Sequence, residues 1–423
     1  MNLQDDILAL GARAHAASRV LARTSTANKN NALLAMADAL EARTTQLIAA
    51  NANDVAAAEA RGLSMAMIDR LVLNEKRVKA MADGIRQVVS LPDPVGEVLR
   101  DWKRPNGLNI SKVRVPIGVI GIIYESRPNV TSDAAVLCTK TGNATILRGG
   151  SEAIFSNTAI AEALQAGLAN GGLPADSILL VHTTDREAVR HMAQMDRYID
   201  LIVPRGGHAL IENVVSHARM PVIKHYHGVC ILYIDAAADL NMAVSIVVNA
   251  KCQRPGVCNA AETVLVHRDV ATAFFQKLAP ALAEKNVELR ADPASFRHLQ
   301  ALGYSKLTAA TDADWTTEYL DYILAVREVC GLDEAIEHIE THGSHHSDCI
   351  ITTDETAAER FLNEVDSATV YWNASTRFTD GAEFGFGAEI GISTDKLHAR
   401  GPMALEELTT YKYKLRGTGQ IRE

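Results

Sequence analysis

The 423-residue sequence lacks the patterns that would place it outside the ordinary globular enzymes. Its six cysteines include no Cys-x-x-Cys pair, which argues against a disulfide framework and for reduced thiols in a cytoplasmic enzyme. Lysine and arginine (42) are outnumbered by aspartate and glutamate (51). This acidic balance argues against a nucleic-acid partner, which requires a basic face.

Long apolar runs and a targeting segment are lacking as well. The longest apolar run, residues 115–124, is interrupted by Pro and Gly and is about half the length that spans a bilayer. The first ten residues are acidic and lack the positively charged start of a signal peptide. We therefore expect a soluble, cytoplasmic protein without membrane contact. Its composition is that of a globular chain with room for two or three domains.

The order of predicted elements indicates an α/β fold. Residues 3–90 have apolar side chains at helical spacing. Residues 97–115 alternate polar and apolar side chains around the pair Asn106-Gly107, which is typical of a β-hairpin. From 116 to about 235, buried strands alternate with helices, which predicts a doubly wound, mostly parallel sheet.

Three glycine-rich turns lie in this region, and two of them directly follow predicted strands. They are Arg148-Gly149-Gly150-Ser151, Gly171-Gly172 and Arg205-Gly206-Gly207. None has the GxGxxG spacing of a dinucleotide fingerprint. Glycine-rich turns at helix N-termini bind phosphate groups, and an arginine there suits a ribose 2′-phosphate better than a bare hydroxyl. We therefore expect this sheet to bind a nucleotide cofactor.

A second α/β unit, over residues 236–350, contains the cysteine with the most reactive setting. Cys258 follows a Pro-Gly pair that bends the chain between two apolar runs. Lys251 and Arg254 nearby would favour the thiolate, which is the nucleophilic form. The alternative is that Cys258 is a small buried hydrophobe, as most unpaired cysteines are. Cys252 is expected to be packed rather than catalytic.

Four histidines lie close together near the end of this unit. They are His338, His342, His345 and His346. The sequence supplies no acidic or thiolate ligand at a fixed spacing beside them. We therefore expect a helix end followed by a polar loop, and no metal site.

Several segments together resemble the aldehyde dehydrogenase superfamily and, more closely, its γ-glutamyl phosphate reductase (glutamate-5-semialdehyde dehydrogenase) family. They are YESRPNVTSDAA, ILRGGSEA, QRPGVCNAAET, NASTRFTDG, HARGPM and, as the most specific match, VCGLDEAIEHIETHGSHHSDCI over residues 329–350. The resemblance covers nearly the whole chain. It implies an aldehyde dehydrogenase-like α/β fold: a doubly wound cofactor domain, an α/β catalytic domain and a small β oligomerisation element.

The resemblance also implies domain boundaries and partners. The implied ranges are 1–100 with 116–235 and part of 350–395 for NADP binding, 236–350 for catalysis, and 101–115 with 396–423 for oligomerisation. The hairpin and the C-terminal strand would then pair with another subunit, so we expect a homo-oligomer. A transient contact with glutamate 5-kinase, which makes the short-lived substrate, is left open.

The reaction implied by the resemblance is the second step of proline biosynthesis. L-Glutamyl 5-phosphate is reduced by NADPH to L-glutamate 5-semialdehyde, with release of phosphate, through a cysteine thioester. Matching positions imply Cys258 as the nucleophile, Asn129 as the side-chain oxyanion donor and Glu318 as the ligand of the nicotinamide ribose. Further cofactor ligands implied by position are Arg148 and Ser151 at the adenosine ribose and Arg205, Gly206 and Gly207 at the pyrophosphate. Candidate anchors for the substrate's α-carboxylate and ammonium are Arg127, Ser375, Thr376 and Arg377.

One departure from the wider superfamily separates two reactions. Hydrolytic aldehyde dehydrogenases carry a general-base Glu where this chain has His225-Tyr226-His227-Gly228. Hydrolysis of a thioester needs an activated water, whereas phosphate is already a competent nucleophile. The missing Glu therefore favours phosphorylating chemistry over the hydrolytic alternative. A non-catalytic nucleotide-binding module is the second alternative, and the presence of both Cys258 and Asn129 argues against it.

Overall fold

The computed structural model describes residues 2–125 and 127–422, which divide into two compact units. Unit 1 comprises Met1–Lys224, Gly385–Gly391 and Met403–Glu423. Unit 2 comprises His225–Phe384 and Ile392–Pro402. Among the described residues, no helix is both long enough and apolar enough to cross a membrane.

Helices open unit 1, as the apolar spacing predicts. They are α1 (Leu3–Leu21), α2 (Thr26–Ala42), α3 (Thr44–Ala60), α4 (Met65–Leu71) and α5 (Glu75–Ser90). The start of α2 is fixed by Ser25, whose Oγ accepts a hydrogen bond from the Asn28 N–H (3.2 Å). Leu33, Met36 and Leu40 on the inner face of α2 are fully buried, so burial of one apolar face stabilises these helices.

A parallel sheet in the order β5-β4-β3-β6 forms the centre of unit 1. The strands are β3 (Val119–Tyr124), β4 (Ala144–Arg148), β5 (Ile178–Leu180) and β6 (Leu201–Arg205). The intervening helices are α6 (Asn129–Lys140), η1 (Ser151–Ala153), α7 (Ile154–Asn170), η2 (Ala175–Ser177), α8 (Glu187–Ala193) and α9 (His208–His217). Every residue of β3 and β4 is buried, which is typical of central parallel strands. The predicted strand–helix alternation is confirmed.

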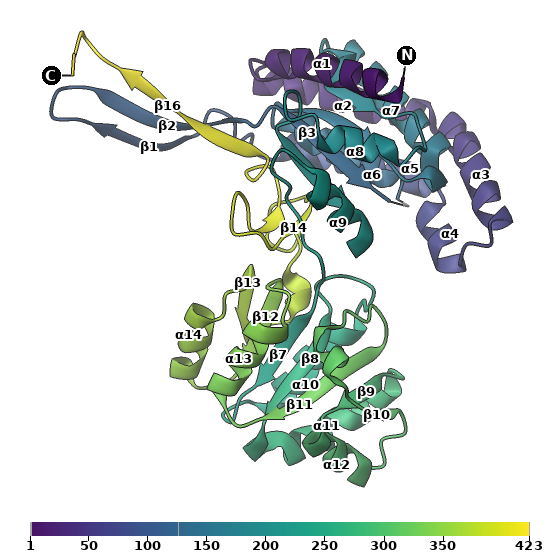
Figure 1. Cartoon of the computed structure of the whole chain (residues 1–423), viewed down its shortest axis with the longest axis vertical. Coiled ribbons are helices and arrows are strands. Elements are labelled where there is room, and N and C mark those ends of the chain that lie inside the picture. The colour runs from purple at the N-terminus through teal and green to yellow at the C-terminus, as the bar shows by residue number, and fades with distance from the viewer. Residues whose placement is uncertain (1, 126, 423) are drawn as a thin grey trace. The chain divides into compact units, whose positions relative to one another are not determined.

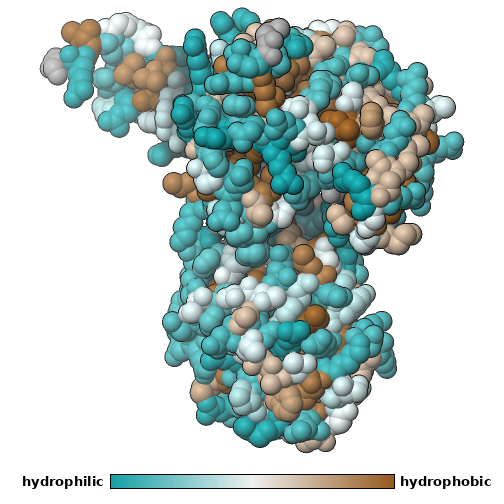
Figure 2. Space-filling view, turned by 45° about the vertical axis from the view of Figure 1, so that its right-hand side comes forward, coloured by the Kyte–Doolittle hydropathy of each residue, from teal (hydrophilic) through white to brown (hydrophobic). Residues whose placement is uncertain are grey.

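A three-stranded antiparallel sheet also belongs to unit 1. The predicted hairpin is confirmed as β1 (Val98–Lys103) and β2 (Asn109–Pro116), and β16 (Thr409–Arg416) pairs along the whole of β2 (Figure 1). Hydrophobic side chains are visible on its surface at the upper left of Figure 2. Tyr413 and Leu415 are more than half exposed. This sheet surface therefore exposes more apolar side chains than a sheet that only faces solvent would require.

Unit 2 is built on a seven-stranded parallel sheet in the order β10-β9-β11-β8-β7-β12-β13. Its strands are β7 (Cys230–Ile234), β8 (Ala261–His267), β9 (Glu288–Ala291), β10 (Leu307–Ala309), β11 (Ile323–Val329), β12 (Ser347–Ile351) and β13 (Thr369–Trp372). Its helices are α10 (Leu240–Cys252), α11 (Arg268–Glu284), α12 (Pro293–Ala301), η3 (Asp312–Thr316), α13 (Leu332–His342), α14 (Glu355–Glu364) and η4 (Thr376–Phe378). Two short strands near the C-terminus, β14 (Gly391–Ser393) and β15 (Gly401–Met403), pair with each other.

The extent of unit 2 differs from the expected range of 236–350. It begins at His225, because β7 pairs with both β8 and β12 and so belongs to the second sheet. It continues beyond 350, because β13 pairs with β12. Strand pairing over long sequence separations decides both ends, and such pairing leaves no local sequence signal.

Candidate active site

Cys258 lies on a turn between a helix and a strand of unit 2. α10 ends at Cys252 and β8 begins at Ala261. The Ala260 N–H donates to Val257 O (3.0 Å), which closes the turn around Cys258. Cys258 is partly exposed, in contrast to the fully buried Cys230, Cys138 and Cys349. The predicted bend is confirmed, and a ligand can reach its cysteine.

Buried groups from two other segments hold this turn. Asn259 Nδ2 donates to Thr379 O (2.8 Å), and Thr376 Oγ1 donates to Asn259 O (2.8 Å). The Cys230 thiol on β7 donates to Cys258 O (3.2 Å). A buried hydrogen bond of this kind contributes about 0.5–1.5 kcal/mol, and leaving its partner unsatisfied costs more. The backbone on both sides of the thiol is therefore fixed.

The backbone of Gly228 packs directly against that of Cys258. A β-carbon at Gly228 would lie 2.0 Å from Cys258 O and 2.6 Å from Cys258 Cα, so only glycine fits without displacing the turn.

In the same stretch, His225 Nδ1 is 2.9 Å from Ile392 O. A carbonyl only accepts, so this ring nitrogen carries the hydrogen.

Glu318 contacts the same glycine. The Gly228 N–H donates to the Glu318 carboxylate, and His227 Nδ1 lies 3.8 Å from Glu318 Oε2. Burial raises the pKa of Glu318, and the hydrogen bond from Gly228 and the charge of Lys251 oppose this rise. Gly228 thus contacts both the backbone of Cys258 and the carboxylate of Glu318.

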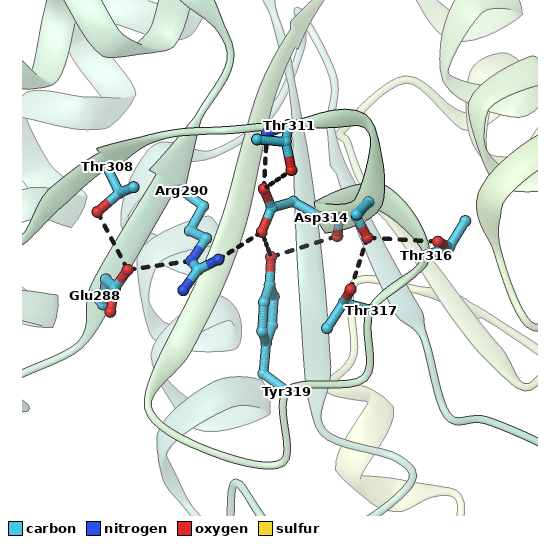
Figure 3. A network of polar contacts seen from close by, with 9 residues as sticks. Glu288, Arg290, Thr308, Thr311, Asp314, Thr316, Thr317 and Tyr319 are labelled. Atoms are coloured by element: carbon cyan, nitrogen blue, oxygen red, sulfur yellow. Dashed lines mark hydrogen bonds and ion pairs between the residues drawn. The ribbon is translucent and has the colours of Figure 1, made fainter. Parts of the chain in front are cut away.

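A hydrogen-bond network fixes the loop that carries Glu318 (Figure 3). Asp314 in η3 accepts from Thr311 N (2.7 Å), from Tyr319 Oη (2.7 Å) and from Arg290 Nη1 (3.0 Å). Tyr319 directly follows Glu318, and its ring points from this loop toward Asp314 in Figure 3. The Asp314 network therefore restrains the backbone next to the Glu318 carboxylate.

A fully buried ion pair supports the other end of this loop. Lys251 Nζ lies 2.6 Å from Glu262 Oε2 with both side chains 0% exposed, and Glu262 Oε1 accepts from the Leu320 N–H (3.3 Å). Burial raises the pKa of Glu262 to about 7 and lowers that of Lys251, while their attraction opposes both shifts. We expected Lys251 to favour the Cys258 thiolate. In the structure, Lys251 instead forms its ion pair with Glu262.

The three predicted substrate anchors at 375–377 have different roles. Thr376 is buried and its hydroxyl donates to Asn259, and Ser375 Oγ accepts from the Arg377 N–H (3.3 Å) at the start of η4. Both hydroxyls help to hold the loop, and their contact with the substrate stays a prediction. The Arg377 guanidinium donates from Nε to Gln253 Oε1 (2.7 Å), at the start of the Cys258 loop. Arg377 alone of the three presents charge there.

Asn129 in unit 1 is the first residue of α6. Its Nδ2 donates to Asp133 Oδ2 (2.7 Å), one turn further along the helix. An amide nitrogen carries two hydrogens, so one is held by Asp133 and one is available in principle to an oxyanion. Arg127, two residues earlier, is exposed. Ser126, the first residue of the predicted Pro-Asn loop, lies outside the described residues.

A cleft of about 630 Å³ opens in unit 1 at the ends of β3 and β4, against α8 and α9. Its lining includes two residues that the sequence predicted, Arg148 and Ser151. It also includes basic and polar residues that were not predicted: Arg61, Arg186, Arg190 and Asn213. The sequence signal that could have indicated them is the spacing of Arg186 and Arg190, which are four residues, or about one helical turn, apart. The size and the polar lining fit a nucleotide.

Arg148 lines this cleft and also holds a neighbouring loop, and its contact with the adenosine ribose stays a prediction. Its guanidinium is buried and donates to the carbonyls of Gly149 (3.0 Å), Thr184 (3.3 Å) and Asp185 (3.4 Å). Burial lowers the pKa of Arg148, although the group stays charged. Arg148 therefore holds the loop before α8, whereas Arg186 on that loop is exposed toward the cleft.

The turn at Arg205 to Gly207 leads into α9 as predicted. Gly207 is the N-cap, and its N–H donates to Glu125 Oε2 (3.0 Å). A carboxylate thus lies at the helix N-terminus, where an anion is favoured. Arg205 packs against Gly391, where a β-carbon would come within 2.5 Å of its Nη1. Gly206 is similarly tight against Glu125.

Two of the four histidines after β11 contact neighbouring side chains. His338 Nδ1 lies 3.0 Å from Arg327 Nη1, and His346 Nδ1 lies 2.9 Å from Ser347 Oγ. Burial lowers the pKa of His346 to about 3, so this ring is neutral. In the part of the chain that the structure describes, no three His, Cys, Asp or Glu side chains gather as a metal ion would require.

Comparison with known proteins places this geometry in context. The model of the aldehyde dehydrogenase family matches residues 3–296. The chain is 55% identical over 423 residues to the γ-glutamyl phosphate reductases of Moorella thermoacetica and Geotalea daltonii. Both matches cover 100% of this chain and 100% of the relative. It is 57% identical over 411 residues to that of Opitutus terrae, covering 97% of this chain and 96% of the relative.

Solved structures give the same picture. The γ-glutamyl phosphate reductase of Thermotoga maritima matches with a TM-score of 0.96 and 45% identity, over 99% of this chain and 100% of that one. An acetylating aldehyde dehydrogenase from Geobacillus thermoglucosidasius matches at 17% identity with a TM-score of 0.70, over 100% of this chain and 98% of that one. The predicted fold class is confirmed.

Replacing Gly228 with Ala tests its packing against the Cys258 turn. The added methyl group would overlap Cys258 O, so we expect the free energy of unfolding in urea to fall by about 1–3 kcal/mol, as overpacking typically costs. The alkylation rate of Cys258 by iodoacetamide should change as well. Gly84→Ala is the matched control, because nothing lies within 4 Å of its β-carbon position. Wild-type stability in Gly228→Ala would contradict this packing.

Proposed function

Because the chain belongs to the aldehyde dehydrogenase family and, within it, to the γ-glutamyl phosphate reductases, we propose that it reduces L-glutamyl 5-phosphate to L-glutamate 5-semialdehyde with NADPH, through a thioester on Cys258. The family carries out the reductase step of proline biosynthesis. The observation that supports the thioester is the turn at Cys258: a partly exposed thiol on a fixed backbone, beside Glu318 and Arg377.

The first step is attack of the Cys258 thiolate on the acyl carbon. The Sγ–C bond forms, the C–O bond to phosphate breaks, and its electron pair leaves with the phosphate oxygen. The carbonyl oxygen carries negative charge in between, and donors aimed at that charge lower the barrier. The backbone N–H of Cys258 and the second amide hydrogen of Asn129 are the proposed donors.

The residues fit a nicotinamide cofactor in two places. The cleft against α8 and α9 in unit 1 has the basic lining that a phosphorylated adenosine needs, and the largely buried Glu318 carboxylate suits ribose hydroxyls. NADPH supplies a hydride to the thioester carbon when bound. Cys258 then leaves the thiohemiacetal as a thiolate, which releases the aldehyde. The Asp314 network keeps Glu318 in place for this step.

A hydrolytic aldehyde dehydrogenase is the alternative reaction. It requires a base that activates water near the thioester. The stretch His225 to Gly228 carries no carboxylate of its own, and His225 Nδ1 is engaged with Ile392 O. Glu318, which bonds to Gly228, is the carboxylate that lies against this stretch. We assign it to the cofactor rather than to water.

The acyl acceptor provides a direct test of the proposed reaction. With glutamate 5-semialdehyde and NADP⁺ in phosphate-free buffer, we expect a burst of NADPH equal to the number of sites and then almost no turnover. The reason is that the stretch His225 to Gly228 carries no carboxylate to activate water for hydrolysis of the Cys258 thioester, and Glu318 is assigned to the cofactor. Inorganic phosphate should restore steady turnover, followed by absorbance of NADPH.

The controls identify any base that is present. His225→Ala should leave phosphate-dependent turnover largely intact if this ring only shapes the pocket. Sustained NADPH formation without phosphate would mean a hydrolytic enzyme. Its loss in Glu318→Gln, but not in His225→Ala, would then name Glu318 as the base.

The preference for NADPH provides a second test. Arg186 is one of three exposed arginines in the cleft lining, with Arg61 and Arg190, and it lies on the loop that Arg148 holds. Arg186→Ala should therefore weaken NADPH binding by about 10-fold or more, as loss of a charged hydrogen bond implies, and NADH binding far less. Fluorescence titration gives both dissociation constants. Arg197→Ala, an exposed arginine outside the cleft lining, is the control. Equal weakening of both cofactors would exclude Arg186 as the reader of the 2′-phosphate.

The remaining proposals concern the second subunit, the substrate anchor and glutamate 5-kinase. The exposed apolar face of the β1-β2-β16 sheet supports pairing with a second subunit, and we propose a homo-oligomer on that basis. Arg127, beside Asn129, is proposed to bind the substrate's α-carboxylate. The proposed substrate is made by glutamate 5-kinase, and a transient contact with that enzyme is compatible with the short life of an acyl phosphate.

A further inference from the structure

Arg377 extends across the loop that carries Cys258. At one end of this loop its Nε donates to Gln253 Oε1 (2.7 Å), and at the other its carbonyl accepts from Asn259 Nδ2 (3.4 Å). Arg377 thus contacts the residues on both sides of the segment that contains the nucleophile, and the charge of Cys258 acts on its guanidinium. The partner of Nε is a neutral amide, so this contact positions the guanidinium without neutralising its charge.

Arg254 places a second guanidinium in the same short loop. It directly follows Gln253, to which Arg377 is bonded, and it is exposed. Burial lowers the pKa of Arg377, the charge of Arg254 lowers it further, and the charges of Asp380 and Cys258 oppose this. Two like charges held near each other are unfavourable in the free protein. An anion between them would remove that repulsion.

The chemistry of the proposed substrate decides which anion this is. L-Glutamyl 5-phosphate has two negative groups: the phosphoryl group on the carbon that Cys258 attacks, and the α-carboxylate four bonds further along. With C–C bonds of about 1.5 Å, the α-carboxylate lies roughly 5 Å from the reacting carbon. Because the Arg377 guanidinium interacts with the charge of Cys258, we assign it to the anionic group next to the reacting carbon, which is the phosphoryl group.

We propose that Arg377 and Arg254 form the site for the phosphoryl group of the acyl phosphate, and for inorganic phosphate in the reverse direction. This inference rests on the proposed function, and it changes the expected role of Arg377 from carboxylate anchor to leaving-group site. When the C–O bond breaks, its electron pair adds charge to the departing phosphate. The proton that the Cys258 thiol loses on ionisation ends on that phosphate, giving hydrogen phosphate and a thioester.

A planar guanidinium suits this task because it can donate two parallel hydrogen bonds to phosphate oxygens. The Arg377 backbone is tied to Asn259, so its charge keeps a fixed position relative to the nucleophile. The reverse reaction has the same requirement, because phosphate must attack the thioester carbon from the side on which it left.

Alkylation of Cys258 measures the site without turnover. In the wild-type chain, inorganic phosphate should slow the reaction of Cys258 with iodoacetamide in a saturable manner, measured by peptide mass spectrometry. Arg377→Ala should need at least about 10-fold more phosphate for the same protection, as loss of a charged hydrogen bond implies. Arg254→Ala, at an exposed position where misfolding is not expected, should weaken protection as well. Arg297→Ala, exposed on α12, is the control.

Kinetics then separate the two anionic groups of the substrate. In Arg377→Ala, the phosphate concentration that restarts turnover after the burst should rise, while the semialdehyde concentration for a half-maximal burst stays unchanged. The opposite result, a higher semialdehyde requirement with unchanged phosphate dependence, would overturn the proposal and make Arg377 the carboxylate anchor. Unchanged phosphate protection in both variants would also overturn it.

Failure of the proposed function gives a different pattern. Steady turnover of the wild-type chain without phosphate would contradict the phosphorylating reaction. The alkylation experiment still decides whether phosphate binds at Arg377 and Arg254 in that case, since it involves no cofactor and no aldehyde.

Discussion

The reciprocal hydrogen bonds between Asn259 and the segment Thr376 to Thr379 tie the Cys258 turn to the loop that carries Arg377. The Cys230 thiol and the backbone of Gly228 constrain the same turn from the β7 side. The nucleophile and the nearby guanidinium consequently form one rigid arrangement. Rate enhancement by orientation depends on such fixed geometry, because a displacement of about 1 Å can cost roughly 100-fold in rate.

Buried charges give the Glu318 loop a comparable rigidity. The Lys251–Glu262 pair is excluded from water, and Asp314 accepts hydrogen bonds from three different residues (Figure 3). A buried ion pair adds little net stability, but removal of one partner typically costs about 3–5 kcal/mol. Such groups are better explained by specificity of position. Here they fix Leu320 and Tyr319, the two residues that follow Glu318.

Local patterns in the sequence predicted the elements well, and they predicted the roles of single polar side chains less well. The Pro-Gly bend at Cys258 and the Asn-Gly hairpin follow from backbone preferences of a few residues, and both are confirmed. The contacts of Arg148 and Thr376 could not be predicted in this way, because their partners include residues on other segments of the chain. Arg186 was missed for the same reason: its place in a cleft depends on the packing of α8 and α9.

The thioester on Cys258 is the central claim, and mass spectrometry of the acyl-enzyme tests it most directly. The chain is mixed with glutamate 5-semialdehyde and NADP⁺ in phosphate-free buffer, quenched with acid and digested. We predict one glutamyl group on the peptide that contains Cys258, attached to that residue and not to Cys252, and its removal when inorganic phosphate is added before the quench. NADPH formation with an unmodified Cys258, or with the glutamyl group on Cys252, would contradict the claim.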